Sequence, residues 1–205
     1  MNLGIRTCFV FSFLTIAFPG LANEPHPMPQ VIINVYNDAQ VSEKVLAQAE
    51  QEATRIFRQA GLDNVWVECR SLNPDLNRKP ECDSPAGPKH LALRIVPWSS
   101  KLRDSVLGIA FLSVEGEGTY SDVFYDAVQK LHQDWHASLS GVLGHVMAHE
   151  VGHLLLGTNA HSPTGIMRLG WQGRELRSIS MGTLLFTPEQ AGSMQAKLFS
   201  VRARK

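Results

Sequence analysis

The chain contains 205 residues, of which 44% are hydrophobic and 19% are charged, as is typical of a single globular domain. Its 19 lysine and arginine residues are balanced by 19 aspartate and glutamate residues, so the formal net charge is zero. The sequence has no basic run and no stripe of aromatic and basic residues. It therefore gives no electrostatic basis for binding nucleic acid or an anionic membrane, and we expect neither as a partner.

The first 22 residues have the layout of a secretory signal peptide. Arg6 supplies a positive charge near the start, and residues 8–18 form an apolar run that is too short to span a bilayer. Small residues precede Ala22, so we expect cleavage after it and export to the periplasm or the extracellular space. A short membrane anchor is the alternative. The mature chain, residues 23–205, is expected to be one monomeric domain without stable membrane association.

Cys69 and Cys82 are the cysteines that remain once the signal segment is removed. An even pair in an oxidising compartment indicates a disulfide bond, which would close a loop that contains Pro74 and Pro80. Closing a loop of this size contributes about 3 kcal/mol in the chain-entropy treatment. The alternative, a thiolate ligand for zinc, is disfavoured because neither cysteine has a partner at C-x-x-C spacing.

Strand and helix patterns follow in chain order after the signal segment. Residues 31–36 are β-branched and aromatic, which predicts a first strand. Apolar residues at helical spacing predict a helix over 41–60, with Ser42 as its N-cap and Gly61 at its end. Residues 65–69 form a second predicted strand, and this strand–helix–strand order predicts a right-handed parallel crossover.

Three more strands are expected in the rest of the chain, with one helix before and one after the motif described below. The pattern predicts strands at 90–96, 108–114 and 120–125, and a short helix through Val128 and Leu131. A final helix begins at Thr187, an N-cap residue that is followed by Pro188 at the first helical position and by Gln190 at the third.

Residues 149–153 read His-Glu-Val-Gly-His, an H-E-x-x-H motif within an apolar and therefore helical and buried stretch. Residues four apart share one helix face, so both histidines can reach one metal ion, and zinc binds neutral imidazole. Glu150 projects about 100° around the helix, where it can act on a metal-activated water without being a ligand. The alternative, two hydrogen-bonded core histidines, is disfavoured because three histidines and a glutamate on one buried helix are costly without a metal or other partners.

The residues after this motif indicate the kind of zinc site. Gly157 can adopt the left-handed conformation that ends a helix, and His161 and Met167 follow it. Here the sequence resembles the metzincin metallopeptidases, close to their matrix-metalloproteinase and archaemetzincin branches, whose motif is H-E-x-x-H-x-x-G-x-x-H before a methionine-containing turn. The resemblance implies one catalytic Zn²⁺ with His149, His153 and His161 as ligands, Glu150 as general base, and Gly157 and Met167 as structural support.

The spacing departs from the family motif. Gly157 lies four residues after His153 and His161 lies eight after it, whereas the motif has three and six. Strict alignment puts Asn159 at the third ligand position, but we interpret the displaced His161 as the ligand, after a longer helix and return loop. The other large group of H-E-x-x-H hydrolases uses a downstream glutamate instead, for which the candidates are Glu175 and Glu189.

The resemblance also implies the fold and the activity. The implied fold is an α/β (α+β, zincin-like) domain. It has a twisted mixed five-stranded sheet with an antiparallel edge strand, a crossover helix, an active-site helix and a C-terminal helix after the Met-turn. In that family the edge strand, here residues 108–112, pairs with an extended peptide or protein substrate. The implied function is a secreted zinc-dependent endopeptidase with Glu150 as general base. A zinc-stabilised, non-catalytic binding module is the alternative, and it has no use for Glu150.

Two features near the motif are less informative. His145 lies one turn before His149, and we expect a surface or capping position for it rather than a role beside the metal. Trp171 and residues 173–183 follow the Met-turn and are expected to form part of the wall of a substrate pocket.

We predict that the mature protein begins at Asn23 and contains no free thiol. Intact-mass measurement before and after alkylation of the unfolded, unreduced protein tests both points. Two alkylatable cysteines would contradict the disulfide, and a mass that includes residues 1–22 would contradict cleavage.

Overall fold

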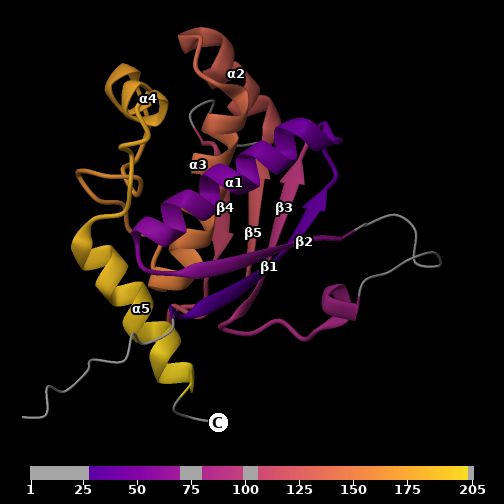
Figure 1. Cartoon of the computed structure of the whole chain (residues 1–205), viewed down its shortest axis with the longest axis vertical. Coiled ribbons are helices and arrows are strands. Elements are labelled where there is room, and N and C mark those ends of the chain that lie inside the picture. The colour runs from indigo at the N-terminus through magenta and orange to yellow at the C-terminus, as the bar shows by residue number, and fades with distance from the viewer. Residues whose placement is uncertain (1–27, 70–79, 99–105, 203–205) are drawn as a thin grey trace, which may run out of the picture.

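The computed structural model describes residues 28–69, 80–98 and 106–202, and the expected signal segment lies outside the described residues. Figure 1 shows a twisted sheet with helices packed against it. The elements in chain order are β1 (Gln30–Asn37), α1 (Glu43–Gln59), β2 (Asp63–Cys69), the short 3₁₀ helix η1 (Pro80–Asp83), β3 (His90–Val96), β4 (Gly108–Phe111), β5 (Tyr120–Phe124), α2 (Tyr125–Trp135), α3 (Leu139–Leu156), α4 (Gly173–Ser180) and α5 (Pro188–Arg202).

The five strands form one mixed sheet in the order β2-β1-β3-β5-β4. Four strands are parallel, and Ile33 of β1 is aligned with Trp66 of β2 and Leu91 of β3. β4 pairs antiparallel with β5 and forms an edge of the sheet. The predicted mixed five-stranded sheet with an antiparallel edge strand is therefore confirmed.

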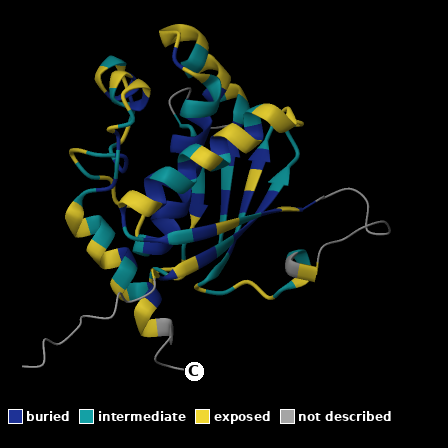
Figure 2. Ribbon diagram, viewed as in Figure 1, coloured by how far each residue is buried: buried dark blue, intermediate teal, exposed yellow. Residues whose placement is uncertain are grey.

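Helices α1 and α3 form the main hydrophobic core together with the sheet. Alternate residues of β1, namely Val31, Ile33 and Val35, are buried, as period-two patterning requires for a sheet with one face covered by helices. Helix α3 contacts α1, α2, α4 and α5 as well as strands β3, β4 and β5. Figure 2 shows the buried residues concentrated between α1, α3 and the strands.

A glycine allows α1 and α3 to pack closely. A methyl group built on Gly144 of α3 would lie 2.5 Å from the carbonyl oxygen of Ala49 and 3.0 Å from Cβ of Glu52, both in α1. No carbon atom fits at 2.5 Å from a backbone oxygen, so this crossing depends on the missing side chain. The close approach of Gly144 to Ala49 and Glu52 therefore determines the position of α3 relative to α1 along the axis of α1.

The links between elements agree with the sequence pattern in most places. Cys69 and Cys82 form the predicted disulfide, which joins the end of β2 to η1 with a Cα–Cα distance of 5.8 Å. At the start of α5, the Thr187 N–H donates to Gln190 Oε1 at 2.9 Å, and the Gln190 N–H donates to Thr187 Oγ1 at 3.3 Å. Among the described residues, none of the helices combines the length and apolar character needed to cross a bilayer.

Two elements differ from the sequence pattern. Strand β4 ends at Phe111 instead of continuing to residue 114, because Ser113 begins a turn in which its N–H donates to the Glu117 carbonyl at 2.8 Å. Helix α4 was not predicted. It is stabilised by a capping box in which the Gln172 N–H donates to the carboxylate of Glu175 at 3.1 Å.

We predict that Gly144→Ala destabilises the protein by about 1–3 kcal/mol, because the added methyl group must push α1 and α3 apart. Gly192→Ala is the matched control. It also lies inside a helix, but a methyl group there meets nothing within 4 Å, so higher helix propensity should stabilise by up to about 1 kcal/mol. Urea unfolding measures both. Equal effects would show that the crossing tolerates a side chain.

Candidate metal centre

Helix α3 is buried on every side, and this burial determines where its polar residues lie. It begins at Ser138, whose hydroxyl accepts from the Gly141 N–H at 3.2 Å, and it ends at Gly157, which has a φ of 70°. Every residue from Val142 to Leu155 is buried. The histidines and the glutamate of the H-E-x-x-H motif therefore lie in the interior.

Three histidines of the predicted site come together. His149 and His153 lie one turn apart on α3, and His161 comes from the segment that follows the helix. One potential ligand atom from each lies within 4.8 Å of the others. The Nε2 atoms of His149 and His153 are 3.1 Å apart. Among the described His, Cys, Asp and Glu side chains, this is the group of three whose arrangement could hold a metal ion.

Backbone carbonyls orient the two helical histidines. Nδ1 of His149 lies 2.7 Å from the carbonyl oxygen of Ile166, and Nδ1 of His153 lies 2.7 Å from that of Thr158. A carbonyl oxygen accepts only, so each Nδ1 carries the proton and donates. Each Nε2 then presents a lone pair to the centre of the group, as in histidines that bind metals.

The surroundings keep the three imidazoles neutral. Burial is the largest cause that lowers the pKa of His149 to about 3; the neighbouring His153 and His161 act in the same direction, and the hydrogen bond to Ile166 opposes them. Burial also lowers the pKa of His153 and of His161. Neutral imidazole is the form that binds a metal ion, so the group is ready to do so at neutral pH.

The geometry fits zinc. Zinc–nitrogen bonds of about 2.0–2.1 Å in a tetrahedral site place two ligand nitrogens about 3.3 Å apart, close to the 3.1 Å between the two helical Nε2 atoms. His161 is exposed, so its ring has room to turn towards the other two. Three protein ligands leave a fourth position open, which is typical of catalytic zinc sites and not of structural ones.

Glu150 lies beside the histidines in sequence but outside the ligand group. Its side chain is buried, with 4% of the residue surface exposed, and burial raises the pKa of its carboxyl group to about 8. A cation in the histidine group would favour the ionised form and oppose this effect. Burial and a cation in the histidine group therefore act on the pKa of Glu150 in opposite directions.

The segment after α3 explains the unusual spacing. The Gly157 N–H donates to the His153 carbonyl at 2.9 Å, so α3 continues through Leu156 before the chain reverses. This longer helix brings the carbonyl of Thr158 to the ring of His153. His161 then lies on the returning segment, close to the helical histidines, as the displaced motif predicts.

The predicted Met-turn packs beneath the helix. The Ser162 N–H donates to the Met167 carbonyl at 2.9 Å and closes the turn. Met167 is fully buried, and a methyl group built on Gly152 would lie 2.9 Å from its sulfur atom and 2.7 Å from the ring of Phe186. The glycine next to His153 therefore makes room for the turn.

The alternative third ligands lie elsewhere. Asn159 is exposed on the returning segment. Glu175 is paired with Arg168 at 2.6 Å and with Arg174 at 3.2 Å. Glu189 lies in the first turn of α5. Neither glutamate belongs to the three-residue group found among the described side chains.

The expected surface or capping position of His145 is wrong. His145 is fully buried, and its Nδ1 lies 2.8 Å from the Gly141 carbonyl. Burial lowers its pKa, although Glu52 at 3.7 Å acts in the opposite direction. Trp171 lies edge-on to His145 and to His149, with ring centroids 6.3 and 5.7 Å away. His145 thus packs behind the ligand group instead of facing solvent.

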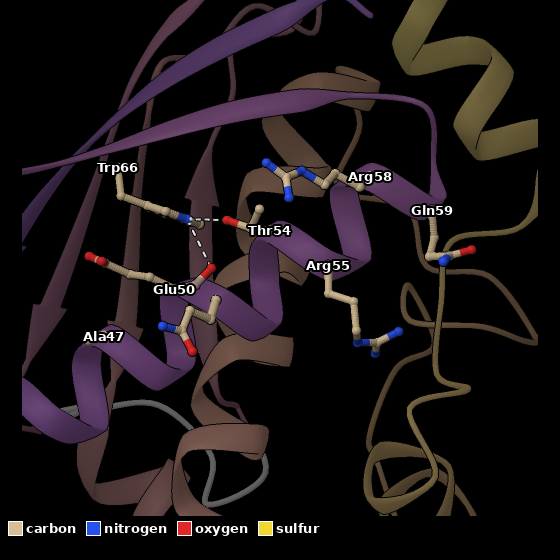
Figure 3. Close-up of a pocket in the computed structure, with 8 residues that line it drawn as sticks. Ala47, Glu50, Thr54, Arg55, Arg58, Gln59 and Trp66 are labelled. Carbon is tan, nitrogen blue, oxygen red and sulfur yellow. Dashed lines mark hydrogen bonds between the residues drawn. The ribbon is translucent and has the colours of Figure 1, made fainter.

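A separate hollow lies on the outer side of α1, next to β2 (Figure 3). The Trp66 indole N–H at its wall donates to the Glu50 carbonyl at 3.0 Å and to Thr54 Oγ1 at 2.9 Å. Arg55 is engaged with Glu52 at 2.7 Å. The hollow has a volume of about 560 Å³ and is lined by Ala47, Glu50, Gln51, Thr54, Arg55, Arg58, Gln59 and Trp66.

The mixed sheet, the helix with the two histidines and the methionine turn define a metzincin-like α/β fold. No protein-family model and no curated protein sequence matches the chain. Solved structures do match. A zinc-dependent peptidase from Methanocorpusculum labreanum (strain Z) is 16% identical, with a TM-score of 0.52 over 79% of this chain and 99% of that chain. Archaemetzincin from Methanopyrus kandleri is 13% identical, with a TM-score of 0.53 over 83% and 97%. The predicted fold is confirmed by this likeness.

We predict that His161→Ala lowers zinc affinity by more than the roughly 10–100-fold that loss of an outer hydrogen-bonding partner costs. Asn159→Ala, Glu175→Ala and Glu189→Ala should keep their zinc content near that of the wild type, because these residues lie outside the histidine group. Metal analysis after dialysis against a zinc buffer measures all four. Full zinc in His161→Ala together with loss in a glutamate variant would refute the assignment.

Proposed function

We propose that the protein is a zinc-dependent endopeptidase. The observation that carries this proposal is the convergence of three neutral histidines, two of them oriented by carbonyls, beside a buried carboxyl group that is not a ligand. A purely structural zinc site is closed by four protein ligands and needs no carboxylate that is not a ligand, such as that of Glu150. The names of the two solved neighbours, a zinc-dependent peptidase and archaemetzincin, agree with this class of enzyme.

The residues of the chain divide the work of peptide hydrolysis. His149, His153 and His161 would hold the zinc ion, which when bound acts as a Lewis acid and activates a water molecule. Glu150 accepts the proton of the attacking water and delivers it to the leaving amine. The hydrogen bonds to Ile166 and Thr158 keep the helical imidazoles in place throughout.

The edge strand β4 supports an extended substrate. It lies at the end of the sheet and, among the described strands, pairs with β5 alone, so its outer edge can accept a further strand. A peptide added there forms main-chain hydrogen bonds that do not depend on its sequence. An extended segment of a peptide or protein is the substrate form that suits this edge.

We also propose that the protein is exported and acts as a monomer in the periplasm or outside the cell. The signal-like residues 1–22 and the disulfide Cys69–Cys82 support export, because structural disulfides persist in oxidising compartments. Glu150 would then act on peptides outside the cytoplasm.

We predict that Glu150→Gln retains stoichiometric zinc but cleaves peptides about 10²–10⁴-fold more slowly than the wild type, because glutamine cannot accept the proton. Glu189→Gln, at the exposed start of α5, is the control and should keep full activity. The assay is cleavage of casein and of a peptide library, with and without a chelator, and with zinc added back.

Wild-type cleavage that survives removal of zinc would exclude a zinc peptidase. Wild-type zinc binding without any cleavage would instead favour the non-catalytic binding module. A Glu150→Gln variant as active as the wild type would show that another group is the general base.

A further inference from the structure

Gly108, the first residue of β4, lies directly against the side chain of Glu150. A methyl group built on Gly108 would lie 2.6 Å from Cγ and 2.7 Å from Cδ of Glu150. It would also lie 2.6 Å from the carbonyl oxygen of Asp122 in the neighbouring strand. Carbon atoms that are not bonded normally approach to about 3.5–4.0 Å, so the Glu150 side chain occupies the place where a side chain of residue 108 would be.

The backbone conformation of Gly108 does not require glycine. Its φ is not in the left-handed region, unlike that of Gly116 or Gly157. It pairs in regular antiparallel register with Val123 of β5. The need for glycine at this position is therefore steric, and it comes from the Glu150 side chain of α3 together with the Asp122 carbonyl of β5.

The alternation of side chains along β4 places this contact on the face of the strand that packs against α3. Side chains alternate along a strand, so residues 108 and 110 share one face, and Ala110 is buried on that face. Ile109 and Phe111 belong to the opposite face, and Phe111 is 48% exposed. The edge strand thus presents its two smallest residues to the helix that carries Glu150.

We propose that Gly108 is a positioning residue that holds the carboxyl group of Glu150 in place by the absence of a side chain. This inference rests on the proposed function, because it assigns to Gly108 the placement of the general base. The Glu150 side chain packs against Gly108, the first residue of the strand that would bind the substrate. The backbone of β4 therefore provides the edge that would receive the peptide, and at Gly108 it also limits how far the Glu150 carboxyl group lies from that edge.

Melting of double variants tests the contact without relying on turnover. Gly108→Ala should lower the melting midpoint by about 4–10 °C, since overpacking must displace Glu150 or β4. Glu150→Ala removes both clashing carbon atoms, so Gly108→Ala made in the Glu150→Ala background should lower the midpoint by less than half as much. Glu150→Gln keeps those atoms, so in that background Gly108→Ala should have its full effect.

Gly118→Ala is the control for general damage to this hairpin. Its methyl group would meet the Phe111 carbonyl at 2.3 Å and Leu112 at 2.6 Å, away from Glu150. Its effect on the midpoint should be the same in the wild-type and Glu150→Ala backgrounds. Equal relief for Gly118→Ala and Gly108→Ala would overturn the proposal, because Glu150 would then not be the specific neighbour.

Steady-state kinetics on the zinc-loaded protein provides the second readout. Gly108→Ala should lower kcat roughly 10–100-fold while KM changes less than threefold, as expected when a reacting group is displaced by about 1 Å. Wild-type kcat in Gly108→Ala would overturn the proposal.

The proposal would also be overturned if neither Gly108→Ala nor the double variant Gly108→Ala, Glu150→Ala folds, since the Asp122 carbonyl would then be what requires glycine. If the wild type shows no zinc-dependent cleavage, the proposed function fails, and the melting coupling still decides whether Gly108 positions Glu150.

Discussion

The hydrogen bonds from His149 and His153 to two backbone carbonyls are the interactions on which the site depends. They select one tautomer for each ring and direct both Nε2 atoms to a common point. Each carbonyl comes from the segment after α3, not from the helix itself. The return loop and the Met-turn are therefore as important to the geometry of the site as the helical spacing of the motif.

Small residues allow this arrangement because α3 is packed on all sides. Gly144 admits α1, Gly152 admits the Met-turn, and Gly108 leaves room for Glu150 beneath the sheet edge. A larger side chain at any of these three positions would displace α3 or its Glu150 side chain, and displacement of α3 moves the histidines and Glu150 together.

Much of the fold could be predicted because its signals are local. The strand at His90–Val96 and the capped start of α5 follow from runs and pairs of neighbouring residues, as does the motif at 149–153. His145 was misplaced because α3 has no solvent-facing side against which a polar residue could be judged. Helix α4 was missed because it is short and begins with Gly173, a weak helix former. The contact of Gly108 with Glu150 joins residues too far apart for any sequence pattern to reveal.

The many contacts of α3 also have a consequence for folding. The motif is local in sequence, but the elements that bury it range from β3 and α1 to α5, and Gln195 of α5 donates to the Ala60 carbonyl, 135 residues away in the chain. Contacts of such separation form slowly, because long loops must close first. Binding of a metal to the assembled histidine group would shift the folding equilibrium towards the native domain by mass action, because the unfolded chain does not hold the three histidines together.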